Sequence, residues 1–213
     1  MEKIILFYKF VPIADPETIM FWQRALCEKL NLKGRILISP HGINATLGGD
    51  LKNLKYYTRE MKAHSLFDSI TYKWSDGGSE HFPKLRVKVK SEIVAFDAPD
   101  EIEVDMSGVT NGGKHLKPDA VHKLVAERGD DVIFYDGRNK YEAQIGRFKN
   151  AIIPDVTTSR DFKKDLETGE ISKHKDKPIV TYCTGGIRCE ILSAMMKKRG
   201  FKEVYQIDGG IVK

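Results

Sequence analysis

The feature that most constrains the fold is a short apolar run that ends in a cysteine. Residues 178–182 read Pro-Ile-Val-Thr-Tyr, which is typical of a buried strand. Cys183 follows in a glycine-containing turn, and residues 188–199 then carry apolar side chains at helical spacing. A strand that leads through a tight turn into a helix indicates an α/β sheet. The cysteine then lies just past the carboxyl end of a central strand, where open α/β sheets bind their ligands.

The predicted turn gives Cys183 an environment that favours its reactive form. Unpaired backbone N–H groups and the positive end of the helix dipole converge where a strand turns into a helix. Such surroundings stabilise a thiolate, which is the nucleophilic form of cysteine. The stretch therefore predicts a nucleophilic cysteine in an anion cradle. Phosphatase, sulfurtransferase and redox chemistry all remain open at this point.

The first ninety residues predict a separate module. Their strand and helix signals follow the order strand, helix, strand, strand, helix, strand, which is typical of a ferredoxin-like α+β unit. The expected strands are residues 4–10, 35–39, 43–47 and 70–74, and the expected helices run from Asp15 or Thr18 to before Gly34 and from Asp50 to His64. Residues 85–89 and 92–96 are expected to extend the sheet.

The rest of the chain alternates strands with helices, which predicts a mainly parallel sheet covered on both faces. The expected strands are residues 132–136, 178–182 and 203–207, with a short strand or turn at 151–153, and the expected helices are residues 118–128, 140–146, 159–166 and 188–199. We expect a ferredoxin-like domain over residues 1–96, an acidic linker over 97–112 and an α/β domain over 113–213. A helix would normally follow the turn at 208–210, so we also expect the chain to be truncated at its C-terminal end.

The charge distribution separates the same modules. Residues 1–90 carry 15 Lys and Arg against 9 Asp and Glu, and residues 109–213 carry 20 against 15. Residues 91–108 between them carry 6 acidic residues and no basic ones. Two basic modules permit binding to a polyanion such as RNA, although solvated lysines on an ordinary surface explain the charge equally well.

Composition also bounds the location and the cofactors. The sequence has no apolar run long enough to cross a membrane and no secretory signal. Three cysteines, Cys27, Cys183 and Cys189, do not make a disulfide framework, and we expect a cytoplasmic protein. No group of residues shows metal-ligand spacing and no phosphate-binding or dinucleotide motif occurs, so we expect no metal and identify no cofactor in the chain.

The loop after the strand resembles the rhodanese active-site loop, Cys-x-x-Gly-x-Arg. It reads Cys183, Thr184, Gly185, Gly186, Ile187, Arg188. Four residues separate its cysteine and arginine, whereas cysteine phosphatases have five, and the smaller ring suits a sulfur-sized anion. The resemblance implies that Cys183 is the catalytic cysteine, that it carries a persulfide, and that residues 184–188 form its cradle. It also implies that Asp136 and Arg138, which match an Asp-x-Arg signature, brace the loop, although a purely structural ion pair remains open.

The whole chain resembles the rhodanese-domain tRNA uridine hydroxylases of bacteria. The most specific matches are residues 7–10 with 13–16, residues 42–44, residues 85–89 with 93–94, residues 113–116 and residues 182–190. The resemblance implies oxygen-dependent 5-hydroxylation of the wobble uridine of tRNA, with tRNA as partner and molecular oxygen as co-substrate. The family usually carries Glu where this chain has His41.

Four further residues are candidates with open roles. Cys189 could resolve a persulfide or pair with Cys183, although a packing role is the more usual one for such a cysteine. His41, Asn44 and His115 could face RNA, but plain turn positions explain them as well. A rhodanese-type sulfurtransferase, which passes sulfane sulfur to a thiol or a tRNA base, is the alternative function. A non-enzymatic binding module is disfavoured, because such a module need not keep Cys183 and Arg188.

Overall fold

The computed structural model describes residues 1–211 and divides the chain into two compact units. The first consists of residues 1–93 and 104–108, and the second of residues 94–103 and those from 109 onwards. No helix among the described residues is long and apolar enough to cross a membrane.

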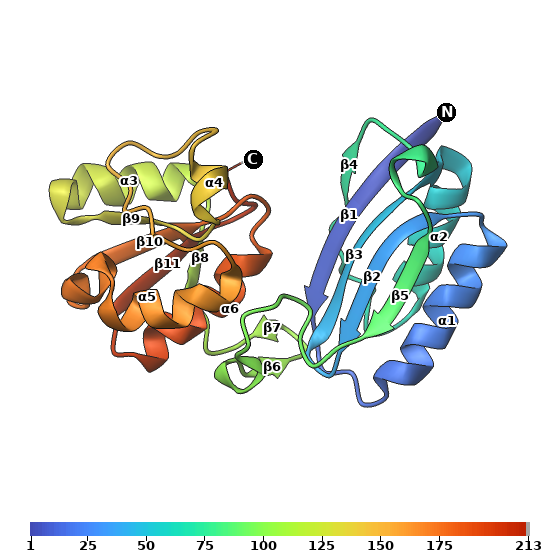
Figure 1. Ribbon diagram of the computed structural model, residues 1–213, viewed down its shortest axis with the longest axis horizontal. Coiled ribbons are helices and arrows are strands. Elements are labelled where there is room, and N and C mark those ends of the chain that lie inside the picture. Colours follow the sequence, from blue (N-terminus) through green and yellow to red (C-terminus); the bar gives the residue numbers. More distant parts are fainter. Residues whose placement is uncertain (212–213) are drawn as a thin grey trace. The chain divides into compact units, whose positions relative to one another are not determined.

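The first unit is a five-stranded sheet with two helices on one face (Figure 1). The strand order is β4-β1-β3-β2-β5, in which only β2 and β5 are parallel neighbours. Its elements are β1 (Glu2–Phe10), α1 (Pro16–Lys29), β2 (Lys33–Ser39), β3 (Gly42–Asp50), α2 (Leu51–Ala63), β4 (Lys73–Ser75) and β5 (Leu85–Val89). The expected ferredoxin-like order is confirmed.

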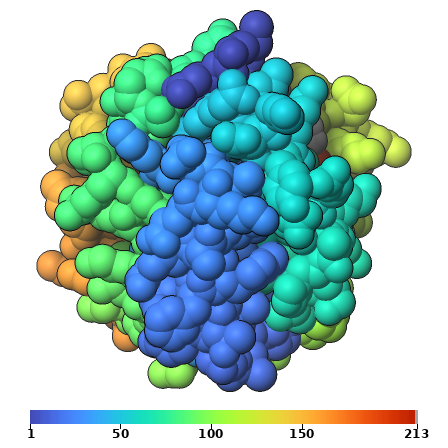
Figure 2. Space-filling model, turned by 90° about the vertical axis from the view of Figure 1, so that its right-hand side faces the viewer, coloured from blue at the N-terminus to red at the C-terminus, as the bar shows by residue number. Residues whose placement is uncertain are grey.

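Both helices of this unit begin at an aspartate that caps them. The Asp15 carboxylate accepts hydrogen bonds from Thr18 N (3.1 Å) and Thr18 Oγ1 (2.6 Å), and Pro16 occupies the first turn of α1. The Asp50 carboxylate accepts from Lys52 N (2.8 Å) at the start of α2. Figure 2 shows the helical face, with α1 in blue at its centre. The two helices bury the apolar face of the sheet, which makes this unit's core.

The second unit is a four-stranded parallel sheet in the order β8-β11-β10-β9. Helix α3 lies on one face, and α5 and α6 lie on the other (Figure 1). Its elements are β8 (Lys114–Leu116), α3 (Pro118–Arg128), β9 (Ile133–Asp136), α4 (Lys140–Ala143), α5 (Phe162–Thr168), β10 (Pro178–Tyr182), α6 (Ile187–Lys198) and β11 (Glu203–Ile207). Every residue of β10 is buried, as expected for a central strand. The α/β architecture with a parallel sheet is therefore confirmed.

The segment between the modules differs from the acidic linker expected over residues 97–112. Residues 92–96 form no strand, and Phe96 is buried with its ring 5.8 Å from that of Phe162 in the second unit. Two short strands follow, β6 (Val104–Asp105) and β7 (Gly108–Val109), and β8 was not expected as a strand. The strand expected over residues 92–96 is therefore absent, because apolar residues of the acidic stretch 91–108, Phe96 among them, fill core positions.

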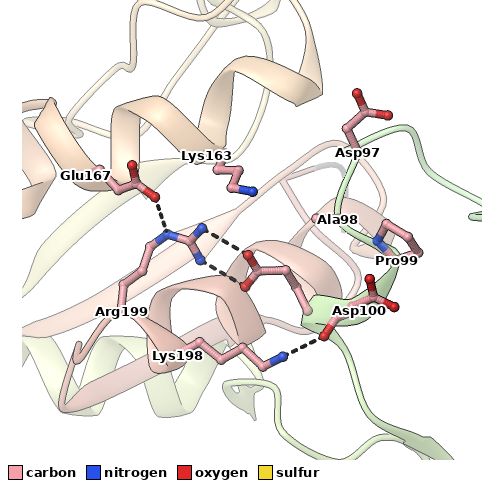
Figure 3. A pocket seen from close by; sticks show the side chains of 9 residues that line it. Asp97, Ala98, Pro99, Asp100, Lys163, Glu167, Lys198 and Arg199 are labelled. Atoms are coloured by element: carbon pink, nitrogen blue, oxygen red, sulfur yellow. Dashed lines mark hydrogen bonds and ion pairs between the residues drawn. The ribbon is translucent and has the colours of Figure 1, made fainter.

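An arginine anchors this segment to the second unit. Arg199 Nη1 and Nη2 lie 2.9 and 3.0 Å from the Glu101 carboxylate, and Arg199 Nε lies 3.4 Å from Glu167. Lys198 Nζ donates to the Asp100 carbonyl at 2.6 Å. These groups line a depression of about 470 Å³ (Figure 3). Because its charged groups mostly bind one another, we regard the depression as a structural anchor.

Candidate active site

Cys183 is the first residue after β10 and is fully buried. Gly186 N donates to Cys183 Sγ at 3.1 Å, and helix α6 begins at the next residue. The turn therefore directs a backbone N–H and the positive end of a twelve-residue helix towards the sulfur. The loop Cys183–Arg188 has the expected position at the carboxyl end of the sheet.

Two glycines make the tight loop possible. Gly186 has φ +100°, which side chains of L-residues rarely allow. Gly210, with φ +76°, passes so close to the loop that a Cβ there would lie 2.4 Å from the Cys183 carbonyl oxygen. Ile211 N donates to that same oxygen at 2.8 Å. The turn after β11 therefore closes over the cysteine loop.

The two cysteines of the site titrate in opposite directions. A hydrogen bond from the Cys189 thiol is the main cause that lowers the pKa of Cys183 to about 6, against the effect of burial. The charge of Arg188 and the N–H groups of Cys189 and Gly186 act in the same direction. Burial and the neighbouring Cys183 raise the pKa of the Cys189 thiol. Cys183 is therefore the more acidic thiol of the two.

Asp136 and Arg138 form a buried brace at the end of β9. Asp136 accepts from Arg138 N (3.0 Å), Arg138 Nε (2.9 Å) and Arg138 Nη2 (2.7 Å). It also accepts from the Tyr182 hydroxyl at 2.9 Å, and Tyr182 immediately precedes Cys183. Arg138 Nη2 extends the brace to the Gly146 carbonyl at 2.6 Å. The pair thus orients the strand end that presents the cysteine.

Glu142 is a site residue that the sequence reasoning did not single out. Its carboxylate accepts two hydrogen bonds from Arg188, at 2.6 and 2.8 Å, and one from Thr184 Oγ1 at 3.1 Å. The Arg188 guanidinium holds the pKa of Glu142 below its ordinary value. Arg188 therefore shares its charge between the Cys183 thiolate and a carboxylate on α4. The pairing spans 46 residues, and no local sequence signal indicates it.

His115 belongs to a polar cluster behind the loop. His115 Nε2 lies 3.3 Å from Glu190 Oε2, and Gln206 Nε2 donates to the same oxygen at 3.1 Å. The hydrogen bond with Glu190 raises the pKa of His115, against the effect of burial. Glu190 follows Cys189 directly on α6, so this cluster fixes the first turn of the helix from the side of β8 and β11.

The remaining candidates lie in the first unit and contact its own backbone. Asn44 Nδ2 donates to the Ile93 carbonyl at 3.0 Å, and the His41 carbonyl accepts from Val11 N at 3.0 Å. Cys27 is fully buried, and burial raises the pKa of its thiol to about 12. The structure therefore brings Cys183, Arg188, Cys189, Asp136, Arg138 and His115 together in one unit, and holds His41 and Asn44 in the other. Residues 1–211 contain no group of three His, Cys, Asp or Glu side chains placed to hold a metal ion.

A buried cysteine at the carboxyl end of a central parallel strand, with its sulfur bound by the N–H that precedes a helix, is consistent with a rhodanese-like domain. The family model for the rhodanese-like domain matches residues 117–213, and that for the UPF0176 acylphosphatase like domain matches residues 2–93. The chain is 64% identical over 212 residues to a tRNA uridine(34) hydroxylase of Corynebacterium diphtheriae, covering 100% of this chain and 68% of that protein. It is 60% identical to one of an Arthrobacter species, covering 100% of this chain and 73% of that protein. The chain belongs to the tRNA uridine(34) hydroxylase family.

A solved structure of a rhodanese-like domain protein from Staphylococcus aureus is similar to part of this chain. The match has 19% sequence identity and a TM-score of 0.37, and it covers 46% of this chain and 88% of the Staphylococcus aureus chain.

Proposed function

We propose that this protein hydroxylates uridine 34 of tRNA at C5, with Cys183 as its catalytic residue and molecular oxygen as co-substrate. The observation that carries the proposal is the similarity to tRNA uridine(34) hydroxylases over the whole chain, at 64% identity for one of them. The C5 position and the use of oxygen rest on the resemblance of the motifs. A cytoplasmic location, where tRNA and reduced thiols occur together, is part of the same proposal.

The site supports a persulfide on Cys183. The thiolate would attack the outer sulfur of a carrier persulfide, forming a new S–S bond while the carrier leaves as its own thiolate. The cradle supplies what the product needs, because Gly186 N and the start of α6 stabilise negative charge on sulfur. The Cys189 thiol would keep its proton and donate a hydrogen bond to the inner sulfur of Cys183. In this scheme the ion pair of Arg188 with Glu142 holds the loop around the sulfur.

The modified nucleosides of cellular tRNA test the proposal. Cells that lack the gene are complemented with the wild type, Cys183→Ala or Cys27→Ala, and their digested tRNA is examined by mass spectrometry. We expect 5-hydroxyuridine derivatives to return with the wild type and with Cys27→Ala, and to stay absent with Cys183→Ala. Cys27 is the matched control because it is a buried thiol of the first unit.

The same digests distinguish the sulfurtransferase alternative. In that alternative, every strain contains hydroxylated uridine, and the strain with Cys183→Ala lacks a thiolated nucleoside instead. This result would contradict the proposed hydroxylation and would indicate sulfur transfer to tRNA.

A further inference from the structure

The segment that borders the loop of Cys183, residues 141–149, is attached to it and to the preceding strand by hydrogen bonds. Glu142 binds Arg188 and Thr184 of the loop. Arg138 donates to the Gly146 carbonyl at 2.6 Å, and Phe148 N donates to the Tyr182 hydroxyl at 3.4 Å. The segment is therefore attached to both the loop and the strand end that precedes Cys183.

The outward side chains of this segment include two large hydrophobic residues. Tyr141 is 61% exposed and Ile145 is 88% exposed. They are the two exposed large hydrophobic side chains among the described residues of the second unit, and they lie four residues apart in the segment whose Glu142 binds the loop of Cys183. Burying them would be favourable, and nothing within residues 1–211 does so. Paired exposed apolar groups of this kind mark interaction sites more often than isolated ones do.

Unpaired positive charge accompanies these side chains. Arg147 and Lys149 are exposed, and neither has an acidic partner in the part of the chain that the structure describes. The acidic residue of the same segment, Glu142, is engaged by Arg188 and does not offset them. Lys140, by contrast, is bound to Asp155 at 2.7 Å. The segment thus presents a positive surface that carries one exposed aromatic ring.

An aromatic ring next to cations is the combination that binds single-stranded nucleic acid. Unpaired bases stack on aromatic side chains, and Lys and Arg neutralise the phosphates between them. An acidic peptide would use the cations but would leave the ring unstacked. An apolar protein partner would have to bury Arg147 and Lys149 without compensation. The chemistry of the surface therefore favours RNA.

We propose that Tyr141, Ile145, Arg147 and Lys149 form the surface that receives the anticodon loop of tRNA beside Cys183. The Tyr141 ring stacks on an unpaired base, Ile145 packs against the same base or its neighbour, and the two cations contact the adjoining phosphates. This inference rests on the proposed function for the identity of the RNA.

Direct binding of an anticodon stem-loop RNA with uridine at position 34 tests this surface. Tyr141→Ala is expected to raise the Kd about 5- to 150-fold, from the usual cost of losing one stacked base. Tyr141→Phe, which keeps the ring, is expected to bind within about twofold of the wild type. Arg147→Gln and Lys149→Gln are each expected to reduce the slope of log Kd against log salt by about 0.7 to 1.

Lys164→Gln is the matched control, because Lys164 is an exposed lysine of α5 in the same unit, and its ammonium group has no ion-pair partner among the described residues. It is expected to leave both the Kd and the salt slope unchanged. Thermal melting and the alkylation rate of Cys183 establish that each variant keeps the fold and the loop.

An unchanged Kd for Tyr141→Ala, or an equal loss for the Lys164 control, would overturn the proposed surface. If the RNA binds as expected but hydroxylation does not depend on Cys183 in cells, the proposed function fails and the surface stands. If hydroxylation depends on Cys183 but the Tyr141 and Arg147 variants bind RNA normally, the surface fails and the function stands.

Discussion

Cys189→Ala tests how the site makes its thiolate. The pKa of Cys183 is about 6, and the hydrogen bond from Cys189 is the largest cause. A hydrogen bond to a charged group contributes about 1.5–3 kcal/mol, which corresponds to about one to two pKa units. Removing the donor should therefore raise the pKa of Cys183 to about 7–8. The thiolate fraction at pH 7 would fall from about 90% to between about 50% and 10%.

The assay is the ultraviolet absorbance of thiolate followed against pH, in a Cys27→Ala background that removes the thiol of the first unit. In the variant Cys27→Ala/Cys189→Ala only Cys183 contributes to the signal. Cys27→Ala/Cys189→Ser restores a donor in the same position and should return the midpoint part of the way towards 6. Melting curves check that the loop remains folded.

The outcome that contradicts the reasoning is a Cys183 midpoint that does not move in Cys27→Ala/Cys189→Ala. In that case Arg188 and the backbone N–H groups suffice to stabilise the thiolate, and Cys189 is a packing residue. A midpoint that rises equally in the alanine and serine variants would point to altered packing instead of a lost donor.

Three further predictions follow from contacts in the second unit. Asp136→Ala leaves the buried Arg138 without its carboxylate and should lower the free energy of unfolding by about 3–5 kcal/mol in urea titrations; a loss below about 1 kcal/mol would argue against a brace. Glu142→Gln frees Arg188 and should let the dianion thiosulfate donate its outer sulfur to Cys183 and leave as sulfite, and unchanged thiosulfate sulfurtransferase activity would contradict this. The hydrogen bond with Glu190 raises the pKa of His115 in the folded protein. The stability that this interaction contributes is therefore fully present below the pKa that His115 has in the unfolded chain, and it is lost as the pH rises through the pKa that His115 has in the folded protein. His115→Gln should therefore destabilise the protein more at about pH 6 than at about pH 8, and equal losses at both would refute the ionic role.

Local patterns predicted most of the fold, because strands, helices and their caps are set by neighbouring residues. The strand 178–182 and the turn at Cys183 were predictable from an apolar run and two glycines. Glu142 was not, because its partner Arg188 is 46 residues away and only the folded sheet brings the two together. The course of residues 94–103 was missed for a related reason. A buried Phe96 in an acidic stretch is decided by the second unit's core, which local charge does not reveal.

The closure of the cysteine loop by Gly210 and Ile211 has a consequence for the newly made chain. Ile211 N binds the Cys183 carbonyl, and the turn that contains it is encoded 25 and more residues after the cysteine. On the ribosome, the cysteine is therefore synthesised well before the turn that completes its surroundings. Until that turn is in place, the Cys183 carbonyl lacks the Ile211 N–H that binds it in the folded domain. The loop therefore reaches its closed shape only after residues 210 and 211 have been added to the growing chain.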